Sequence, residues 1–462
     1  MNRALFTLIF LLGFYTLPAQ QRVPVFASRS DSAAYWQTID RLTDAMRNPR
    51  YTFRIDSLSK VMASLRDKAV RYRTEYRPSP LYINYSKRPS DASTVTRVSL
   101  VDYKGKELPD SLFLLTNLKE LELINTRIRK LPARLEELKS LEKISLLNNR
   151  PKGRMVLHKS ERIKSLVIHD DEIDRRPRSF RKYSHLESLD LSRCNLDRFP
   201  KLKGIPRLKR LLLTENRLQL NELKRGMPGL EELVLTSNSI RAVPPAIGEF
   251  TSLKKLNLNA NQVEQLAPEM GKLQQLEQLS LYKNNLKALP KELYGLSSLR
   301  VIDLYYNQLE ELDPAILNWT QLEILYLANN RLFTLPETLG HLKNLRELYL
   351  HHNRLSNLPA SLGQLDSLRV FRVNNNNLVE FPASLLRLSA LENLDLASNS
   401  LTSLPEALFD YPHLQILSIK GNPLEPAART QALEWARKAM QKRPLMIHFE
   451  GLMEPNDPVE NK

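Results

Sequence analysis

One repeated pattern runs through most of this chain and limits the folds that the chain can adopt. Residues 276–355 contain copies of L-x-x-L-x-L-x-x-N-x-L that recur every 23 residues, aligned on Asn284, Asn307, Asn330 and Asn353. Most copies continue into L-P-x-x-L. A single copy has too little apolar surface to form its own core, so successive copies must stack on one another. The pattern therefore predicts one elongated array of small coils rather than several globular domains.

The spacing within each copy predicts a short strand followed by a turn. The last two leucines of L-x-x-L-x-L are two residues apart, so they point to one side of a strand and the residue between them points to the other. The asparagine side chain offers donors and an acceptor to backbone groups of the turn, and we expect stacked asparagines to form a hydrogen-bonded ladder. Proline six residues later (Pro290, Pro336 and Pro359) fixes φ and lacks an N–H, which suits a return path outside the sheet.

The repeats are predicted to cover residues 93–422 in about fifteen units. The asparagine position falls at 103, 126, 149, 171, 194, 216, 238, 261, 284, 307, 330, 353, 376, 399 and 422, and asparagine occupies eleven of these fifteen positions. The exceptions are Tyr103, Thr126, Asp171 and Cys194. All four belong to the first five units, so the irregular end of the array is the N-terminal end.

The first 20 residues predict a secretory signal peptide. Arg3 supplies a positive charge, Ala4 to Leu17 supply an apolar stretch of 14 residues, and Pro18-Ala19-Gln20 ends it with small and polar residues. A bilayer span needs about 17–25 apolar residues, so this stretch is short for a permanent anchor. We expect cleavage after Ala19 or Gln20 and an exported protein (periplasmic, cell-surface or secreted) with no transmembrane span in its mature form.

The segments on either side of the repeats are expected to close the two ends of the array, where apolar surface would otherwise be exposed. Residues 21–92 are interpreted as a helical N-terminal cap, with helices predicted at 31–46 and 55–76; an independent domain is the alternative. The first strand of the array is expected at 95–100. Residues 423–453 are predicted to form a C-terminal cap, with a helix at 427–441 and a strand at 445–449, followed by a disordered tail at 454–462.

The repeat resembles that of the leucine-rich repeat family, in the 23-residue form found in intracellular Ras-pathway and cell-polarity scaffolds and in many bacterial proteins. The resemblance implies an α/β fold: a leucine-rich repeat solenoid (horseshoe) with a parallel β-sheet on its concave face and helical caps. It also implies that the concave face recognises proteins. The chain lacks the cysteine-rich caps of secreted vertebrate members, and its single cysteine rules out an intramolecular disulfide. Export without disulfides fits a bacterial member better than an animal ectodomain.

No motif in the sequence predicts catalysis, a metal or a cofactor. Cys194 occupies the asparagine position of its repeat, where we expect it to be buried, whereas a reactive thiol needs exposure and an electropositive environment. His351 and His352 are adjacent, so on a strand their side chains would diverge. The sequence contains no phosphate-binding loop, dinucleotide-binding fingerprint, nucleophile elbow or zinc-spaced cluster. We therefore predict a protein that is not an enzyme.

Aromatic and charged residues gather at the outward positions of the central strands. The outward positions lie six, four and two residues before the asparagine, and the residue directly before it lies at the rim. Neighbouring parallel strands are about 4.8 Å apart, so the side chains should form one patch. Tyrosine and arginine are enriched in binding hot spots. Packing of tyrosines against one another on the sheet surface is the alternative. The predicted partner-binding residues are Tyr282, Asp303, Tyr305, Tyr306, Tyr326, Tyr349, His351 and Arg372.

A basic flank at residues 151–225 supports a different function. It carries 20 Lys or Arg against 10 Asp or Glu, including Arg175, Arg176, Arg178, Arg181 and Lys182. Attraction to an anionic surface is one interpretation, so a glycan- or lipopolysaccharide-binding envelope protein is the alternative to a protein- or peptide-binding one. A solvated face is the other interpretation. Nucleic acid is not expected as a partner, because aromatic residues that would stack on bases are not interleaved with the basic ones.

Overall fold

The computed structural model describes the backbone of residues 20–26, 69–76, 83–84 and 156–157, and the full residues 92–149 and 158–452 except 129, 170–179, 181, 201 and 203. The chain divides into two compact units, residues 1–156 and 157–462. The predicted signal peptide up to residue 19, the predicted helix at 31–46 and the predicted tail at 454–462 lie outside the described residues. The position of the cleavage site and the continuity of the array across the junction between the units stay predictions.

The first unit contains an antiparallel pair of strands and a parallel sheet. The antiparallel pair is β1 (Gln20–Phe26) with β2 (Ala69–Tyr76). The parallel sheet contains, in chain order, β3 (Ile83–Asn84), β4 (Arg97–Val101), β5 (Glu120–Ile124) and β7 (Lys143–Leu147). The remaining elements are the 3-10 helices η2 (Ala92–Thr94), η3 (Asp110–Leu114) and η4 (Ala133–Glu137) and the short strand β6 (Lys130–Leu131). The short strand β8 (Val156–Leu157) contains the last residue of the first unit and the first residue of the second. Strand β4 begins two residues later than the strand predicted at 95–100.

Strand β2 shows that the helix predicted at 55–76 is wrong over residues 69–76. Residues Val70, Tyr72, Thr74 and Tyr76 alternate with charged residues, which is the two-residue period of a strand. These residues are also β-branched or aromatic, and such side chains favour strands. A three- to four-residue spacing of apolar residues also fits this segment, but its pairing with β1, more than forty positions away in the sequence, makes it a strand. The N-terminal cap is therefore not purely helical.

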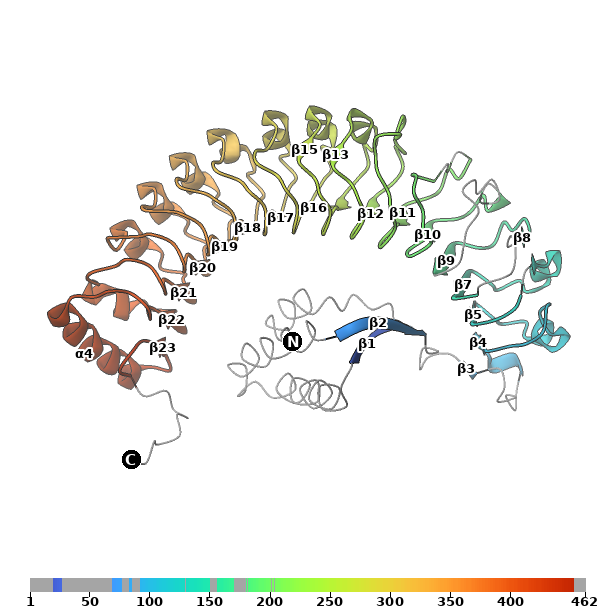
Figure 1. The fold of residues 1–462 in the computed structure, drawn as a ribbon, viewed down its shortest axis with the longest axis horizontal. Coiled ribbons are helices and arrows are strands. Elements are labelled where there is room, and N and C mark those ends of the chain that lie inside the picture. Colours follow the sequence, from blue (N-terminus) through green and yellow to red (C-terminus); the bar gives the residue numbers. More distant parts are fainter. Residues whose placement is uncertain are drawn as a thin grey trace, which may run out of the picture. The chain divides into compact units, whose positions relative to one another are not determined.

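The second unit contains a parallel sheet in which each strand pairs with the next one along the chain. Leucine or another apolar residue occupies the middle of each strand and sets the register, as in Leu279, Ile302 and Leu325. The strands follow the inner edge of the curved unit (Figure 1). They are β9 (Ser165–His169), β10 (Ser188–Asp190), β11 (Arg210–Leu212), β12 (Glu232–Val234), β14 (Lys255–Asn257), β16 (Gln278–Ser280), β17 (Val301–Asp303), β18 (Ile324–Tyr326), β19 (Glu347–Tyr349), β20 (Val370–Arg372), β21 (Asn393–Asp395), β22 (Ile416–Ser418) and β23 (Met446–His448).

Five-residue 3-10 helices occupy the return path on the outer side of the curve (Figure 1). Pro290, Pro336 and Pro359 lie directly before three of these helices with φ of −65°, −71° and −63°, so the prediction that they lie outside the sheet is confirmed. The helices are η6 (Pro245–Glu249), η7 (Pro268–Lys272), η8 (Lys291–Gly295), η9 (Pro314–Asn318), η10 (Glu337–His341), η11 (Ala360–Gln364), η12 (Ala383–Arg387) and η13 (Glu406–Asp410). Two short strands, β13 (Ala242–Val243) and β15 (Gln265–Leu266), pair with each other.

A helix and a strand follow the last repeat, as predicted, while their role as a cap stays a prediction. Helix α4 (Pro426–Lys442) is followed by β23, which extends the parallel sheet by pairing with β22. Ala432, Ala436 and Ala439 form the buried stripe of the helix at the spacing expected for one helical face. The last repeat therefore ends against a helix and one further strand.

The predicted asparagine ladder is present. Asn330 Nδ2 donates to the carbonyl oxygens of Leu304 and Leu327 at 2.9 Å each, and Asn330 Oδ1 accepts the Leu309 N–H at 3.0 Å. Two of these three backbone groups belong to the preceding repeat, so each asparagine connects one coil to the previous one. The same three contacts recur at Asn284 and Asn307. Buried backbone groups that no strand can satisfy are thus paired by side chains.

Candidate partner-binding site

Strands β16 to β20 position the predicted site on the inner face of the second unit. Leu325 and Leu327 are fully buried between the sheet and the outer helices, whereas Tyr326 between them is half-buried and points the opposite way. The parallel register places Asp303, Tyr326, Tyr349 and Arg372 next to one another on consecutive strands. The choice of the outward strand face from the sequence is therefore correct.

Three tyrosine rings form the N-terminal part of the site. The ring centroids of Tyr305 and Tyr306 are 4.5 Å apart with nearly parallel planes, and Tyr282 meets each of these rings edge-on at 5.7 Å. Tyr306 has a left-handed backbone with φ of 56°, at a turn that repeats after each strand. This turn carries the Tyr306 ring to the rim, where its side chain is 46% exposed.

The C-terminal part of the site is a second stack joined to the first by a histidine. Tyr326 and Tyr349 stack with centroids 4.8 Å apart, and the Arg372 guanidinium carbon lies 5.9 Å from the Tyr349 ring centre. The His351 ring is 6.3 Å from that of Tyr349 and 5.4 Å from that of Tyr305. Its Nε2 is also 3.3 Å from the Tyr305 hydroxyl. His351 thus makes the two stacks one continuous cluster.

The structure brings all eight predicted residues together, but they do not offer equal surface. We call Tyr282, Asp303, Tyr305, Tyr306, Tyr326, Tyr349, His351 and Arg372 the concave patch. Tyr349 and Asp303 are only 8% and 5% exposed, so they offer little accessible surface to a partner. Tyr306 is exposed, and the other five are half-buried. The predicted alternative, packing between tyrosines, therefore describes part of what these rings do.

Burial keeps most of the concave patch uncharged at neutral pH. It lowers the pKa of His351 to about 3, and the nearby Arg372 and His352 act in the same direction. Burial also raises the pKa of Tyr326 and of Tyr349. The pKa of Asp303 is raised to about 7 by burial, although the hydrogen bond from the Tyr305 N–H opposes the shift. A largely apolar surface with hydroxyl groups suits a protein interface.

The aspartates four residues before the ladder position have a backbone role that the sequence analysis missed. Asp303 Oδ1 accepts the N–H of Tyr305 at 3.0 Å, and Asp395 Oδ1 accepts that of Ala397 at 3.1 Å. The sequence signal was the recurrence of aspartate or asparagine at this position, as in Asp190 and Asn257. Asp303 was predicted as a partner contact. It is buried, and the contact that it makes in the structure is the hydrogen bond from the Tyr305 N–H at the end of β17.

Family models match the part of the chain in which these strands and the ladder recur. Residues 232–423 match a model described as a leucine-rich repeat region, and residues 185–204 match one described as a leucine-rich repeat. The chain is a leucine-rich repeat protein. A comparison with curated proteins gave no match.

Solved structures of other leucine-rich repeat proteins are similar to this one. A leucine-rich repeat protein from Leptospira interrogans is 26% identical with a TM-score of 0.63, and the match covers 80% of this chain and 99% of that chain. The ectodomain of the plant membrane receptor kinase GASSHO1/SCHENGEN3 from Arabidopsis thaliana, in complex with CASPARIAN STRIP INTEGRITY FACTOR 2, is 26% identical with a TM-score of 0.55, covering 77% of this chain and 46% of that chain. An internalin from Listeria monocytogenes, 18% identical with a TM-score of 0.51 over 79% of this chain and 88% of that chain, shares the fold.

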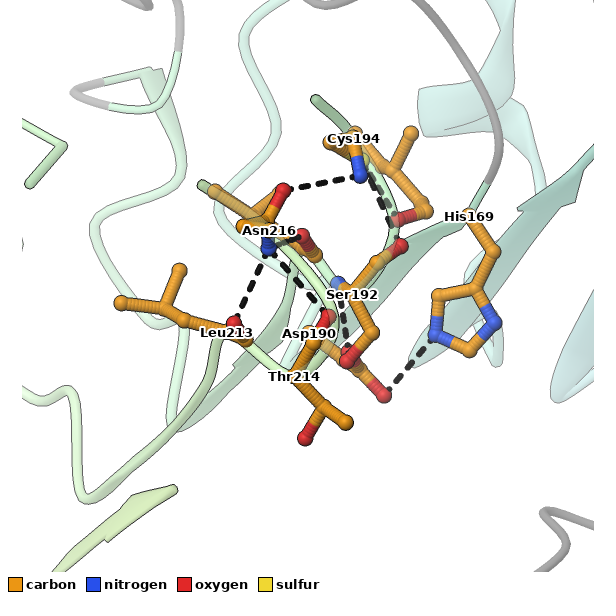
Figure 2. Close-up of polar contacts among 9 residues, drawn as sticks. His169, Asp190, Ser192, Cys194, Leu213, Thr214 and Asn216 are labelled. Carbon is orange, nitrogen blue, oxygen red and sulfur yellow. Dashed lines mark hydrogen bonds and ion pairs between the residues drawn. The ribbon is translucent and has the colours of Figure 1, made fainter. Parts of the chain in front are cut away.

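Cys194 is part of the leucine-rich repeat ladder, as predicted. It is 2% exposed, its Sγ lies 3.0 Å from the Ile168 carbonyl oxygen, and its N–H donates to Asn216 Oδ1 (Figure 2). Close by, His169 Nε2 is 3.0 Å from Asp190 Oδ2, and the Ser192 hydroxyl donates to Asp190 Oδ1. The serine bonds the aspartate rather than the histidine, and all three are buried, so this cluster lacks the order of a nucleophilic triad.

The densest part of the basic flank lies outside the described residues. Arg175, Arg176, Arg178 and Arg181 are not described, so a glycan- or lipopolysaccharide-binding role for this leucine-rich repeat protein stays a prediction. Within the part of the chain that the structure describes, no helix has the length and apolar character needed to cross a membrane.

Proposed function

We propose that this leucine-rich repeat protein is an exported, non-enzymatic protein that binds a protein or peptide partner with its concave patch. The observation that carries the proposal is the single chain of ring contacts from Tyr282 through Tyr305 and His351 to Tyr349 and Tyr326. Rigid aromatic side chains with polar tips gain contact area while losing little conformational entropy on binding. The concave patch therefore has the chemistry of a binding hot spot.

The similar structures support this proposal in two ways. The Arabidopsis receptor ectodomain is in complex with CASPARIAN STRIP INTEGRITY FACTOR 2, which is a precedent for partner binding by a chain of this fold. The Leptospira protein supports a bacterial origin, and export is proposed from the N-terminal apolar stretch. A secreting host should release a protein without residues 1–19 or 1–20, and intact mass would detect retained Met1.

The test is capture of partners from an envelope extract with the variant Tyr305→Ala/Tyr306→Ala/Tyr326→Ala. Tyr349 is left in place because it is buried, so its truncation would also destabilise the fold. Each hot-spot truncation costs about 2 kcal/mol or more in binding, and about 1.4 kcal/mol corresponds to tenfold in affinity. We expect the triple variant to lose the captured partner.

The matched control is Thr214→Ala/Val234→Ala/Lys255→Ala, on the same inner face at β11 to β14. These residues are half-buried or exposed and lie outside the concave patch. The control should capture the partner at the wild-type level, with both variants melting within a few degrees of the wild type. Loss of the partner by the control, or its retention by the tyrosine variant, would place the binding site elsewhere.

Salt concentration separates this proposal from glycan or lipopolysaccharide binding. Contacts between exposed charges weaken as the screening length falls from about 10 Å at 0.1 M salt to about 3 Å at 1 M. A contact centred on tyrosines should weaken only in part over this range, whereas binding of an anionic glycan by the basic flank should be lost.

A further inference from the structure

A row of charged residues at the entrance of the strands alternates in sign and is broken once. These residues lie seven positions before each ladder asparagine, and we call them the entry row. Like charges on neighbouring strands destabilise a sheet, and alternation avoids that cost. The entry row is Lys209, Glu231, Lys254, Glu277, Arg300, Glu323, Arg346, Arg369 and Glu392.

The break lies between β19 and β20, beside the concave patch. Arg346 pairs with Glu323 at 3.5 Å and Arg369 pairs with Glu392 at 2.8 Å, so the two arginines turn to partners on opposite sides. Glu323 is also shared with Arg300, at 2.8 Å. The two neighbouring arginines therefore share no carboxylate between them in the structure.

Arg372 adds a third guanidinium on β20, about 10 Å further along the strand at about 3.3 Å per residue. Among the described residues it has no ion-pair partner within 4.0 Å, and its Nε is buried without a hydrogen-bond acceptor. Asp395, its register neighbour on β21, directs Oδ1 to the Ala397 N–H instead. Glu347 accepts the Tyr349 hydroxyl at 2.9 Å. Each of these carboxylates therefore has one oxygen bonded away from Arg372, although the charge of Arg372 still acts on Asp395 and opposes the rise in its pKa on burial.

We propose that β19 and β20 bind an acidic segment of the partner, with a Glu or Asp side chain on Arg372 against the Tyr349 ring and further carboxylates facing Arg346 and Arg369. A carboxylate would supply the acceptor that the Arg372 Nε lacks, and the planar guanidinium can bond it with two parallel N–H groups. The ring of Tyr349 holds one face of the Arg372 group. This inference rests on the proposed function and adds the chemistry and position of the partner's charge.

The test measures binding of fluorescein-labelled copolymers to the full chain by fluorescence anisotropy. The acidic probe is a random copolymer of glutamate and tyrosine, and the basic probe is one of lysine and tyrosine. The wild type should bind the acidic probe, and Arg369→Ala/Arg372→Ala should weaken that binding at least tenfold. Arg372→Lys keeps the charge without the two-pronged geometry and should give an intermediate loss.

The matched control must remove two positive charges elsewhere, because a chain with a net charge of +17 attracts any polyanion. Arg241→Ala/Arg437→Ala does so at exposed positions on a loop and on α4, and should change binding less than twofold. Equal losses in the two double variants, no binding of the acidic probe by the wild type, or tighter binding of the basic probe would overturn the inference.

The same variants distinguish this inference from the proposed function. If the tyrosine triple variant loses the captured partner while Arg369→Ala/Arg372→Ala keeps it, the partner uses the concave patch without an acidic contact, and only this inference fails. If the tyrosine triple variant keeps the partner, the proposed function itself fails.

Discussion

Replacing one ladder asparagine tests the physical basis of the fold. In Asn330→Ala the carbonyl oxygens of Leu304 and Leu327 and the N–H of Leu309 each lose a hydrogen bond of 2.9–3.0 Å. All three backbone groups belong to residues whose side chains are fully buried. The effect should therefore be much larger than that of removing a surface amide.

The magnitude follows from the number of groups left unpaired. One buried donor or acceptor without a partner costs about 1–3 kcal/mol. Only the Leu309 N–H is left without a partner, because Asn307 Nδ2 still donates to the Leu304 oxygen and Asn353 Nδ2 to the Leu327 oxygen, at 3.0 Å each. Each carbonyl oxygen loses one of its two hydrogen bonds, which is worth about 0.5–1.5 kcal/mol. We expect a total loss of roughly 2–5 kcal/mol in the free energy of unfolding. Asn330→Asp keeps only the acceptor and brings a charge beside two carbonyl oxygens, so it should destabilise at least as much.

The assay is urea unfolding followed by circular dichroism, with hydrogen exchange at the Leu309 amide as a local readout. The matched control is Asn377→Ala, because Asn377 is exposed and its side chain is not part of the ladder. The control should change stability by no more than about 0.5 kcal/mol. A loss in Asn330→Ala as small as in the control, with Leu309 exchange unchanged, would refute the assignment of the ladder as a main source of cohesion between repeats.

Three further predictions concern the core and the concave patch. Leu325→Ala should cost about 2–5 kcal/mol in urea unfolding, through lost burial and the cavity left behind. Because burial raises the pKa of Asp303 from 3.8 to about 7, the folded state holds a proton that the unfolded chain releases in that window. Wild-type stability should therefore fall as pH rises from about 4 to 7, and Asp303→Asn should remove this fall when unfolding midpoints are compared at about pH 5 and pH 8. At position 306 the backbone is left-handed, which costs about 1–2 kcal/mol for most residues and less for asparagine. Tyr306→Asn also loses ring contacts worth about 0.5–1.5 kcal/mol each. The two effects nearly cancel, so the thermal unfolding midpoint should change little while partner capture drops.

The architecture of the repeats could be predicted because one local pattern specifies it many times over. The spacing of Leu325, Leu327 and Asn330 determines which side chains are buried and which backbone groups are bonded, and each further copy restates the same requirement. The C-terminal helix was predictable for a similar reason, since Ala432, Ala436 and Ala439 follow one helical face. In both places local spacing and tertiary packing agree.

Features that depend on partners distant in the sequence were not predictable. Strand β2 exists because β1 pairs with it, and the helical spacing upstream gave no sign of that partner. The strand register was enough to predict which residues form the concave patch, but not how deeply each of them is buried. Tyr349 is covered by stacking on Tyr326 and by the neighbouring Arg372, and these contacts depend on the side-chain conformations of adjacent repeats.

Site-specific photocrosslinking tests the concave binding site most directly. A photoreactive phenylalanine, p-benzoylphenylalanine, would replace Tyr306, the most exposed ring of the concave patch, and in a second protein it would replace Lys291 on the outer helix η8. Each protein would be irradiated in the envelope extract and its adducts identified by mass spectrometry. The account predicts a defined protein or peptide adduct at position 306 and none at position 291. The same adduct at 291 but not at 306 would contradict it.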